Sequence, residues 1–169
     1  MITIRDATIA DAPALCDAEK QTVLTPGLLV SAADELTPQH FAERISLLSE
    51  GRGKYLVASA SATPGTLIGH ACLYPMPLQN IAHVLRLDMC VHPGCTGKGV
   101  GRLLLDALIA WARQHPHSVK IELLVRATNL PAIALYSSAG FVEEGRLRQR
   151  VKLPDGRMLD DFSMAYFLK

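Results

Sequence analysis

The chain has 169 residues, of which 49% are hydrophobic and 20% are charged, and its formal net charge at pH 7 is +1. This length and composition fit one globular domain with a core of its own, and they exclude an intrinsically disordered chain. The small net charge gives no basis for bulk binding to nucleic acid or to a membrane surface.

Cysteine and histidine usage favours a reducing compartment and no metal site. The cysteines form no C-x-x-C pair, so free thiols are the simplest interpretation. His115-Pro116-His117 has no cysteine or carboxylate beside it and is more typical of a helix end than of a metal site. No apolar run reaches about 18 residues, and the N-terminus lacks a basic-then-apolar pattern. We expect a soluble, cytoplasmic protein that has neither nucleic acid nor a membrane as a partner.

The N-terminal third predicts a strand, two helices and an irregular loop. Residues 2–5 alternate as in a strand, and Thr8 is placed to cap a helix that buries Ile9, Ala12, Leu15 and Cys16. A second helix begins at Thr37-Pro38 and carries apolar residues at helical spacing, namely Phe41, Ile45 and Leu48. Residues 22–36 between them show no clear period. They suit either one wall of a substrate site or a loop that packs its own apolar residues beneath itself. The apolar residues of this loop are Leu24, Leu28, Leu29 and Val30.

The middle of the chain predicts a hairpin, then a strand that leads into a glycine-rich turn and a helix. Residues 55–58 and 67–74 are predicted strands, joined by a turn at Thr63-Pro64-Gly65. Residues 84–91 form the next strand, and the helix follows with Val100, Leu103, Leu104, Ala107, Leu108 and Trp111. Glycines before a helix N-terminus favour an anion site, although such a turn can also be a mere connector. The spacing matches neither a P-loop nor a dinucleotide-binding fingerprint.

The C-terminal third predicts a buried strand, a helix and a final hairpin. The strand covers residues 119–125, and Asn129 and Pro131 open a helix that Gly140 ends. Strands around residues 141–151 and 158–167 follow, joined by a turn at Pro154-Asp155-Gly156. Early alternation of helices and strands, with a hairpin at the end, predicts a mixed sheet flanked by helices.

Two local motifs stand out in this order of elements. The first is Thr96-Gly97-Lys98-Gly99-Val100-Gly101, and the second is Asn129-x-x-Ala132-x-x-Leu135-Tyr136, followed by Gly140-Phe141. Together they resemble the GNAT superfamily of acyl-CoA-dependent N-acyltransferases, whose pattern Q/R-x-x-G-x-G/A the first motif matches with Thr96 in place of the usual Gln or Arg. The resemblance covers essentially the whole chain. It implies a single α/β (α+β mixed) domain over residues 1–169, with a central, mostly antiparallel sheet of about seven strands, splayed in the middle and flanked by about four helices.

The resemblance also implies acetyl-CoA as co-substrate, without a metal. Backbone N–H groups of the glycine turn would bind its pyrophosphate, and the strand before the turn would bond its pantetheine arm. Lys98 would add charge there or remain a solvated loop lysine, and Asn129 would bond cofactor or backbone or act only as an N-cap. The implied cofactor-binding residues are Met89, Cys90, Val91, Thr96, Gly97, Lys98, Gly99, Val100, Gly101, Arg102, Asn129 and Ala132.

Tyr136 matches the family tyrosine that protonates the departing thiolate, and it is the predicted catalytic residue. Its alternative is a core tyrosine with a satisfied hydroxyl. The general base stays open between Asp88, Glu122 and water, and transfer through Cys90 or Cys95 is rejected because neither has an evident activating base.

The tail narrows the resemblance to bacterial enzymes of the L-amino-acid N-acetyltransferase type. Its features are residues 140–146, the Pro154-Asp155-Gly156 turn, and Asp160-Asp161 before Met164. The favoured acceptor is a free amino acid or a similar small amine. Other acceptors are a protein N-terminus or an aminoglycoside, and the alternative from another class is a non-catalytic acyl-CoA sensor. Family analogy also allows a homodimer through the terminal strands.

Overall fold

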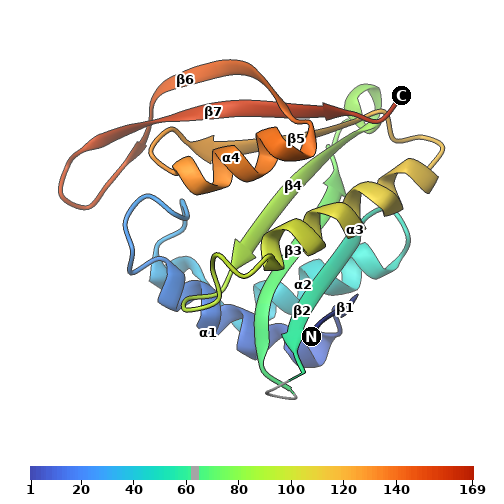
Figure 1. Ribbon diagram of the computed structural model, residues 1–169, viewed down its shortest axis with the longest axis horizontal. Coiled ribbons are helices and arrows are strands. Elements are labelled where there is room, and N and C mark those ends of the chain that lie inside the picture. The colour runs from blue at the N-terminus through green and yellow to red at the C-terminus, as the bar shows by residue number, and fades with distance from the viewer. Residues whose placement is uncertain (62–64) are drawn as a thin grey trace.

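Seven strands form one sheet in the order β1-β2-β3-β4-β5-β7-β6 in the computed structural model, which describes residues 1–61 and 65–169 (Figure 1). Thr63 and Pro64 of the predicted turn lie outside the described residues. The sheet elements are β1 (Ile2–Asp6), β2 (Lys54–Ala60), β3 (Leu67–Pro75), β4 (Val84–Val91), β5 (Lys120–Arg126), β6 (Val142–Lys152) and β7 (Met158–Phe167). The α-helices are α1 (Ala12–Thr22), α2 (Pro38–Ser49), α3 (Val100–Gln114) and α4 (Leu130–Ala139). The predicted mixed sheet with flanking helices is therefore confirmed.

The sheet opens between its two central strands. β4 and β5 form the parallel pair, and their ladder joins only Val84–Arg86 to Lys120–Glu122. The remaining neighbours in the sheet are antiparallel. Beyond Arg86 the two strands diverge, as Figure 1 shows, so residues 87–91 of β4 are paired with β3 on one side only. The predicted splay is present, and it leaves backbone N–H and C=O groups of β4 without a strand partner.

Two apolar clusters cover the two faces of the sheet. Alternation along β2 sends Leu56 and Ala58 to one face and Tyr55 and Val57 to the other. The first face packs against α3, whose inward side chains are Val100, Leu104, Leu105, Leu108, Ile109 and Ala112. The second face packs against α1 and α2. Figure 1 shows α3 on the side of the sheet opposite to α1 and α2. The glycine turn lies where β4 ends and α3 begins.

Local signals set most helix ends as predicted. The Thr37 side chain accepts a hydrogen bond from the backbone N–H of His40, and that of Asn129 accepts one from Ala132. Thr8 precedes a 3-10 turn, Ile9–Asp11, and α1 begins only at Ala12. Ile9 is 59% exposed, so its predicted burial is wrong: the separate 3-10 turn points its side chain away from the face that buries Ala12, Leu15 and Cys16. None of the helices in the described ranges is long and apolar enough to cross a bilayer.

Candidate active site

A cavity of about 910 Å³ lies at the opening between β4 and β5. Its walls come from β4, β5, the glycine turn, the start of α3, α4, and the region of α1 and α2. Of the loop predicted as a substrate wall, Leu28, Leu29 and Val30 line the cavity. Leu24 does not, and it is 70% exposed. Three of the four loop residues thus line the cavity, as a substrate wall would require, and their role toward a substrate stays a prediction.

The glycine turn forms one end of the cavity. Gly97 and Gly99 have φ of 72° and 81°, a conformation that residues with a Cβ rarely adopt, and both face open space. Within the described residues, Thr96, Gly97, Lys98 and Gly99 donate no backbone hydrogen bond. The first amides of α3 are also free of helical partners and carry the positive end of the helix dipole. A row of unpaired N–H groups at a helix N-terminus fits a phosphate or pyrophosphate.

Of the predicted cofactor-binding residues, Lys98 alone does not line the cavity. Its Nζ donates to the carbonyl of Gly94 at 2.8 Å, so the ammonium braces the turn. Arg102 lines the cavity, and its Nε donates to Asp106 at 2.9 Å. Met89, Cys90 and Val91 line the cavity along the unpaired edge of β4. An extended ligand with amide groups fits this edge, because it would satisfy the backbone as an added strand does.

Tyr136 lies in the same cavity, on α4, with Asn129 and Ala132. Its side chain is buried, and within the described part of the chain its hydroxyl makes no hydrogen bond. Burial raises the pKa of Tyr136 well above its ordinary value, so the phenol keeps its proton at neutral pH. Asn129 is engaged as the cap of α4 through Ala132. The phenol is therefore a neutral donor facing the cavity.

The two carboxylates weighed as general base have different surroundings. Asp88 lines the cavity, where its Oδ2 accepts from Arg44 at 2.9 Å. Glu122 does not line it: this residue is in the paired part of the β4–β5 ladder and accepts from Lys120 at 2.8 Å. Of the two, only Asp88 can meet a ligand in the cavity, and it does so as half of an ion pair.

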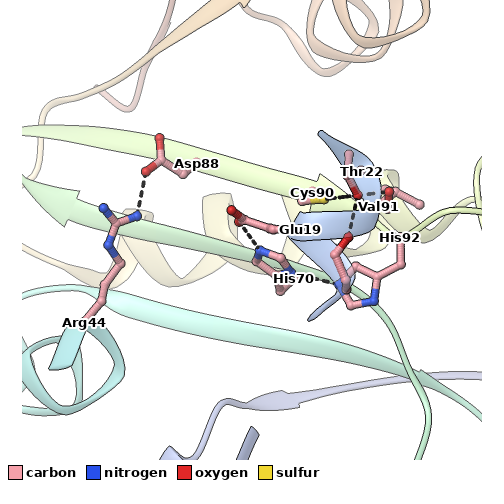
Figure 2. A network of polar contacts seen from close by, with 9 residues as sticks. Glu19, Thr22, Arg44, His70, Asp88, Cys90, Val91 and His92 are labelled. Atoms are coloured by element: carbon pink, nitrogen blue, oxygen red, sulfur yellow. Dashed lines mark hydrogen bonds and ion pairs between the residues drawn. The ribbon is translucent and has the colours of Figure 1, made fainter. Parts of the chain in front are cut away.

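The structure brings together a further group that sequence reasoning missed. Glu19 of α1 contacts His70 of β3, which contacts His92 just after β4, as Figure 2 shows. Arginines 44, 86, 126 and 150 also line the cavity. None of these residues belongs to a local motif. They are far apart in sequence, and only the strand register and the docking of α1 place them side by side.

The described ranges contain no cluster of three or more His, Cys, Asp or Glu side chains that could hold a metal ion. The cavity instead offers main-chain donors, an open strand edge, a neutral phenol, and both guanidinium and carboxylate groups. These are the parts that binding and transfer of an activated acyl group require.

Comparisons with known proteins agree with this arrangement. The chain is 29% identical to the L-amino acid N-acetyltransferase AaaT of Escherichia coli (strain K12) over 101 residues, which cover 60% of this chain and 62% of that protein. The match thus spans less than two thirds of that relative's length. A putative acetyltransferase of Salmonella typhimurium, solved with its cofactor acetyl-CoA, shares the fold with a TM-score of 0.88 at 24% identity, covering 99% of this chain and 94% of that one.

A third protein is similar over nearly its whole length. The ribosomal-protein-alanine N-acetyltransferase of Brucella melitensis is 29% identical, with a TM-score of 0.87 and coverage of 98% of this chain and 99% of that one. The sequence model of the acetyltransferase (GNAT) family matches residues 23–141, which is more than half of the chain. On this match and the fold, the chain belongs to the GNAT family of acetyltransferases.

Proposed function

We propose that this protein transfers the acetyl group of acetyl-CoA directly to a primary amine, and that the acceptor is a free amino acid or a similar small amine. One observation carries the proposal: a single cavity joins the glycine turn, the unpaired edge of β4 and the phenol of Tyr136. These are the places that a pyrophosphate, a chain of amides and a departing thiolate would each need.

These three parts of the cavity identify the residues that would hold acetyl-CoA. Amides of Gly97 to Gly101 suit the pyrophosphate, with Thr96 and Arg102 beside them. Met89, Cys90 and Val91 suit the pantetheine arm through their main chain. Val100, Asn129 and Ala132 complete the walls on the α3 and α4 sides. Lys98 would act only by bracing the turn. When bound, acetyl-CoA supplies a thioester carbonyl, the electrophile of the reaction.

Two groups of the chain would then act on the thioester, a backbone N–H of β4 and the phenol of Tyr136. A backbone N–H at the open edge of β4 donates to the carbonyl oxygen, where negative charge develops in the transition state. Tyr136 hydrogen-bonds the departing sulfur and donates its proton to it, and this proton is present because the buried phenol is fully protonated at pH 7. Burial of most of the Tyr136 side chain lowers the local dielectric and strengthens its interaction with the sulfur.

The charges of the cavity favour an acceptor that carries both an ammonium and a carboxylate. Arg44 and Arg126 are paired with Asp88 and Asp161. Arg86 and Arg150 line the cavity and are paired with no carboxylate in the described part of the chain. A guanidinium without a partner binds a carboxylate well, and Glu19 offers the opposite charge for an ammonium. Similarity to an L-amino acid N-acetyltransferase supports this class of acceptor.

A protein N-terminus is the second candidate. It is favoured by the full-length similarity to a ribosomal-protein-alanine N-acetyltransferase. The two candidates differ at one chemical group, because a free amino acid has an α-carboxylate and a peptide N-terminus does not.

The test is release of free thiol from acetyl-CoA with a panel of amines, containing common amino acids, their amides, polyamines, an aminoglycoside and short peptides. Turnover with amino acids, reduced strongly for the matched amides, is the expected result. Turnover with peptides alone would move the acceptor to a protein N-terminus. Binding of acetyl-CoA by calorimetry without turnover of any amine would point to a sensor.

Arg86→Met is expected to raise KM for an amino acid by about 10-fold to 100-fold, since a hydrogen bond to a charged group is worth about 1.5–3 kcal/mol. The KM for the matched amide should change little. Arg52→Met, which removes an exposed arginine outside the cavity, is the control. Equal effects of Arg86→Met on amino acid and amide would show that Arg86 does not bind the carboxylate.

Cys90→Ala is expected to keep kcat within a few fold of wild type. The Cys90 thiol is buried against the Thr22 hydroxyl at 3.5 Å, and burial raises the pKa of this thiol to about 12. A protonated thiol is a poor nucleophile, so acetyl should pass directly to the amine. Mass spectrometry of wild type with acetyl-CoA alone should find no acetylated protein. A stable adduct at Cys90 together with loss of turnover in Cys90→Ala would instead establish a two-step route.

A further inference from the structure

Glu19, His70 and His92 form a chain of polar side chains (Figure 2), and the Glu19 end of this chain lines the cavity. Glu19 Oε1 lies 2.9 Å from His70 Nε2, His70 Nδ1 lies 2.9 Å from His92 Nε2, and His92 Nδ1 lies 3.0 Å from the carbonyl oxygen of Leu67. The Glu19 side chain is 19% exposed and lines the cavity, whereas that of His70 is 5% exposed. Only the glutamate end of the chain therefore meets a ligand.

The carbonyl of Leu67 determines where the protons of this chain lie. A carbonyl only accepts, so His92 Nδ1 must carry a hydrogen. Burial lowers the pKa of His92 to about 4, so at pH 7 the ring is neutral and its Nε2 is an acceptor. His70 must then donate from Nδ1. A neutral His70 with its one hydrogen on Nδ1 presents a bare Nε2 to Glu19.

The contact between Glu19 and His70 is consequently a place for one proton. With a proton in it, the carboxyl and the imidazole share a hydrogen bond at 2.9 Å. Without one, a carboxylate oxygen and a ring nitrogen face each other with their lone pairs, which is unfavourable in a buried site. The geometry that the Leu67 carbonyl and His92 impose thus leaves one position for a proton, between Glu19 Oε1 and His70 Nε2.

This contact lies beside the place where acetyl transfer would occur. His70 and Cys90 are direct partners in the β3–β4 ladder. Thr22, three residues after Glu19 on α1, touches the Cys90 sulfur. Cys90 also lies beyond the point where β4 loses its pairing with β5, at the unpaired edge that suits the thioester end of the cofactor. Glu19 thereby overlies the reacting part of the cavity, on the face where Asp88 and Arg86 also lie.

We propose that Glu19 is the catalytic proton acceptor for the acceptor amine, sharing the proton with His70, while His92 is a positioning residue that sets the tautomer of His70. This inference rests on the proposed acetyl transfer. One ammonium proton moves to the Glu19–His70 contact, and the freed nitrogen lone pair forms the C–N bond as the C–S bond breaks. Tyr136 gives its proton to the departing sulfur. The second proton lost by the nitrogen then moves to the Tyr136 oxygen and restores the phenol. The proton held by Glu19 and His70 then leaves to solvent through the cavity.

The other ionisable groups around Glu19 are not in a state to replace it. Tyr55 of β2, which stacks on His70, has a pKa raised far above its ordinary value by burial. Burial likewise raises the pKa of the Cys72 and Cys90 thiols to about 12 each. All three stay protonated at pH 7. Arg44 and Asp88, farther along the cavity, form an ion pair with each other. On this face, the Glu19–His70 contact is therefore the place left to receive a proton from the acceptor.

Glu19→Gln is the sharpest test, because the amide can donate to His70 Nε2 and so fills the contact permanently without removing the hydrogen bond. The variant should fold normally and bind acetyl-CoA as wild type does. Its kcat at saturating acceptor should fall by about 10²-fold or more at pH 7, the usual contribution of general base catalysis. The deficit should shrink as the pH rises toward the pKa of the acceptor's ammonium, since a neutral amine needs no proton acceptor.

Asp17→Asn is the matched control, because it removes one carboxylate from the exposed face of the same helix and should leave kcat and its pH profile unchanged. If the wild-type enzyme turns over and Glu19→Gln keeps kcat within a few fold of it, the role of Glu19 is overturned and the proposed function stands. A change in KM alone, with kcat intact, would also overturn it, since Glu19 would then only bind the ammonium. Absence of wild-type turnover with every amine would overturn the proposed function, and the proton transfer with it.

A measurement on the wild-type protein is independent of how any variant folds. Nitrogen-15 NMR of the histidine rings is expected to show His92 as the neutral Nδ1–H tautomer at pH 7, with Nδ1 of His70 protonated. A His92 ring that carries its proton on Nε2 would reverse the direction of the hydrogen bonds and overturn the proposal.

Discussion

Tyr136→Phe is expected to lower kcat by about 10²-fold or more while the Kd for acetyl-CoA stays the same. The phenol is the neutral donor that faces the cavity, because burial keeps its pKa high, and phenylalanine keeps the ring but removes the proton. Within the described residues the hydroxyl makes no hydrogen bond, so its loss leaves no buried polar partner unsatisfied. Thermal unfolding should therefore be unchanged, and the effect should appear in thiol release measured at saturating acceptor.

The control for Tyr136→Phe is Tyr166→Phe, which removes a phenol that contacts Arg113 outside the cavity. It should leave kcat within a few fold of wild type. Full activity in Tyr136→Phe would discard the proton-donor role of this residue, and it would leave the enzyme activity itself in place.

Asp161→Ala is expected to destabilise the protein by about 3–5 kcal/mol, the usual cost of leaving one member of a buried ion pair alone. Asp161 and Arg126 are direct partners in the β5–β7 ladder, and their side chains are 2% and 7% exposed. Two hydrogen bonds join them, at 2.5 Å and 3.0 Å. Since a domain of this kind has only about 5–15 kcal/mol of stability in total, the loss should be plain in the midpoint of urea unfolding.

Asp155→Ala is the matched comparison. Asp155 also pairs with an arginine, Arg157, but the two side chains are 54% and 66% exposed, so its loss should leave the midpoint of urea unfolding nearly unchanged. Replacing both Arg126 and Asp161 by apolar residues of similar size should recover much of the stability lost in Asp161→Ala, because no unpaired charge then remains buried. Equal losses for Asp161→Ala and Asp155→Ala would show that the buried pair has no special importance.

Sequence patterns predicted the elements and the glycine turn well because these depend on neighbours along the chain. The periodicity of Phe41, Ile45 and Leu48 marks a helix face, and these residues are buried. Pro38, directly after Thr37, and Pro131, two residues after Asn129, mark helix starts, since the first helical N–H groups need no helical partner. The turn before α3 could be predicted because its glycines must adopt positive φ and its amides must be free, both of which are local requirements.

Prediction was less successful where a side chain's surroundings come from elsewhere in the chain. Lys98 belongs to the glycine motif, yet its ammonium binds the Gly94 carbonyl. Glu122 is on a central strand, as predicted, but on the paired part of its ladder and outside the cavity. Ile9 fits the helical period and is exposed, because a 3-10 turn separates it from α1.

The sequence by itself thus determined the order of strands and helices, the glycine turn before α3 and the position of Tyr136 on its helix. Tertiary structure alone decided which side chains share the cavity. Glu19, His70 and His92 come from a helix, a strand and the end of another strand. They meet because the β3–β4 register places His70 beside Cys90, and because the apolar face of α1 docks over that pair. Local sequence carries propensity and periodicity, whereas register and docking result from burial of apolar surface across the whole fold.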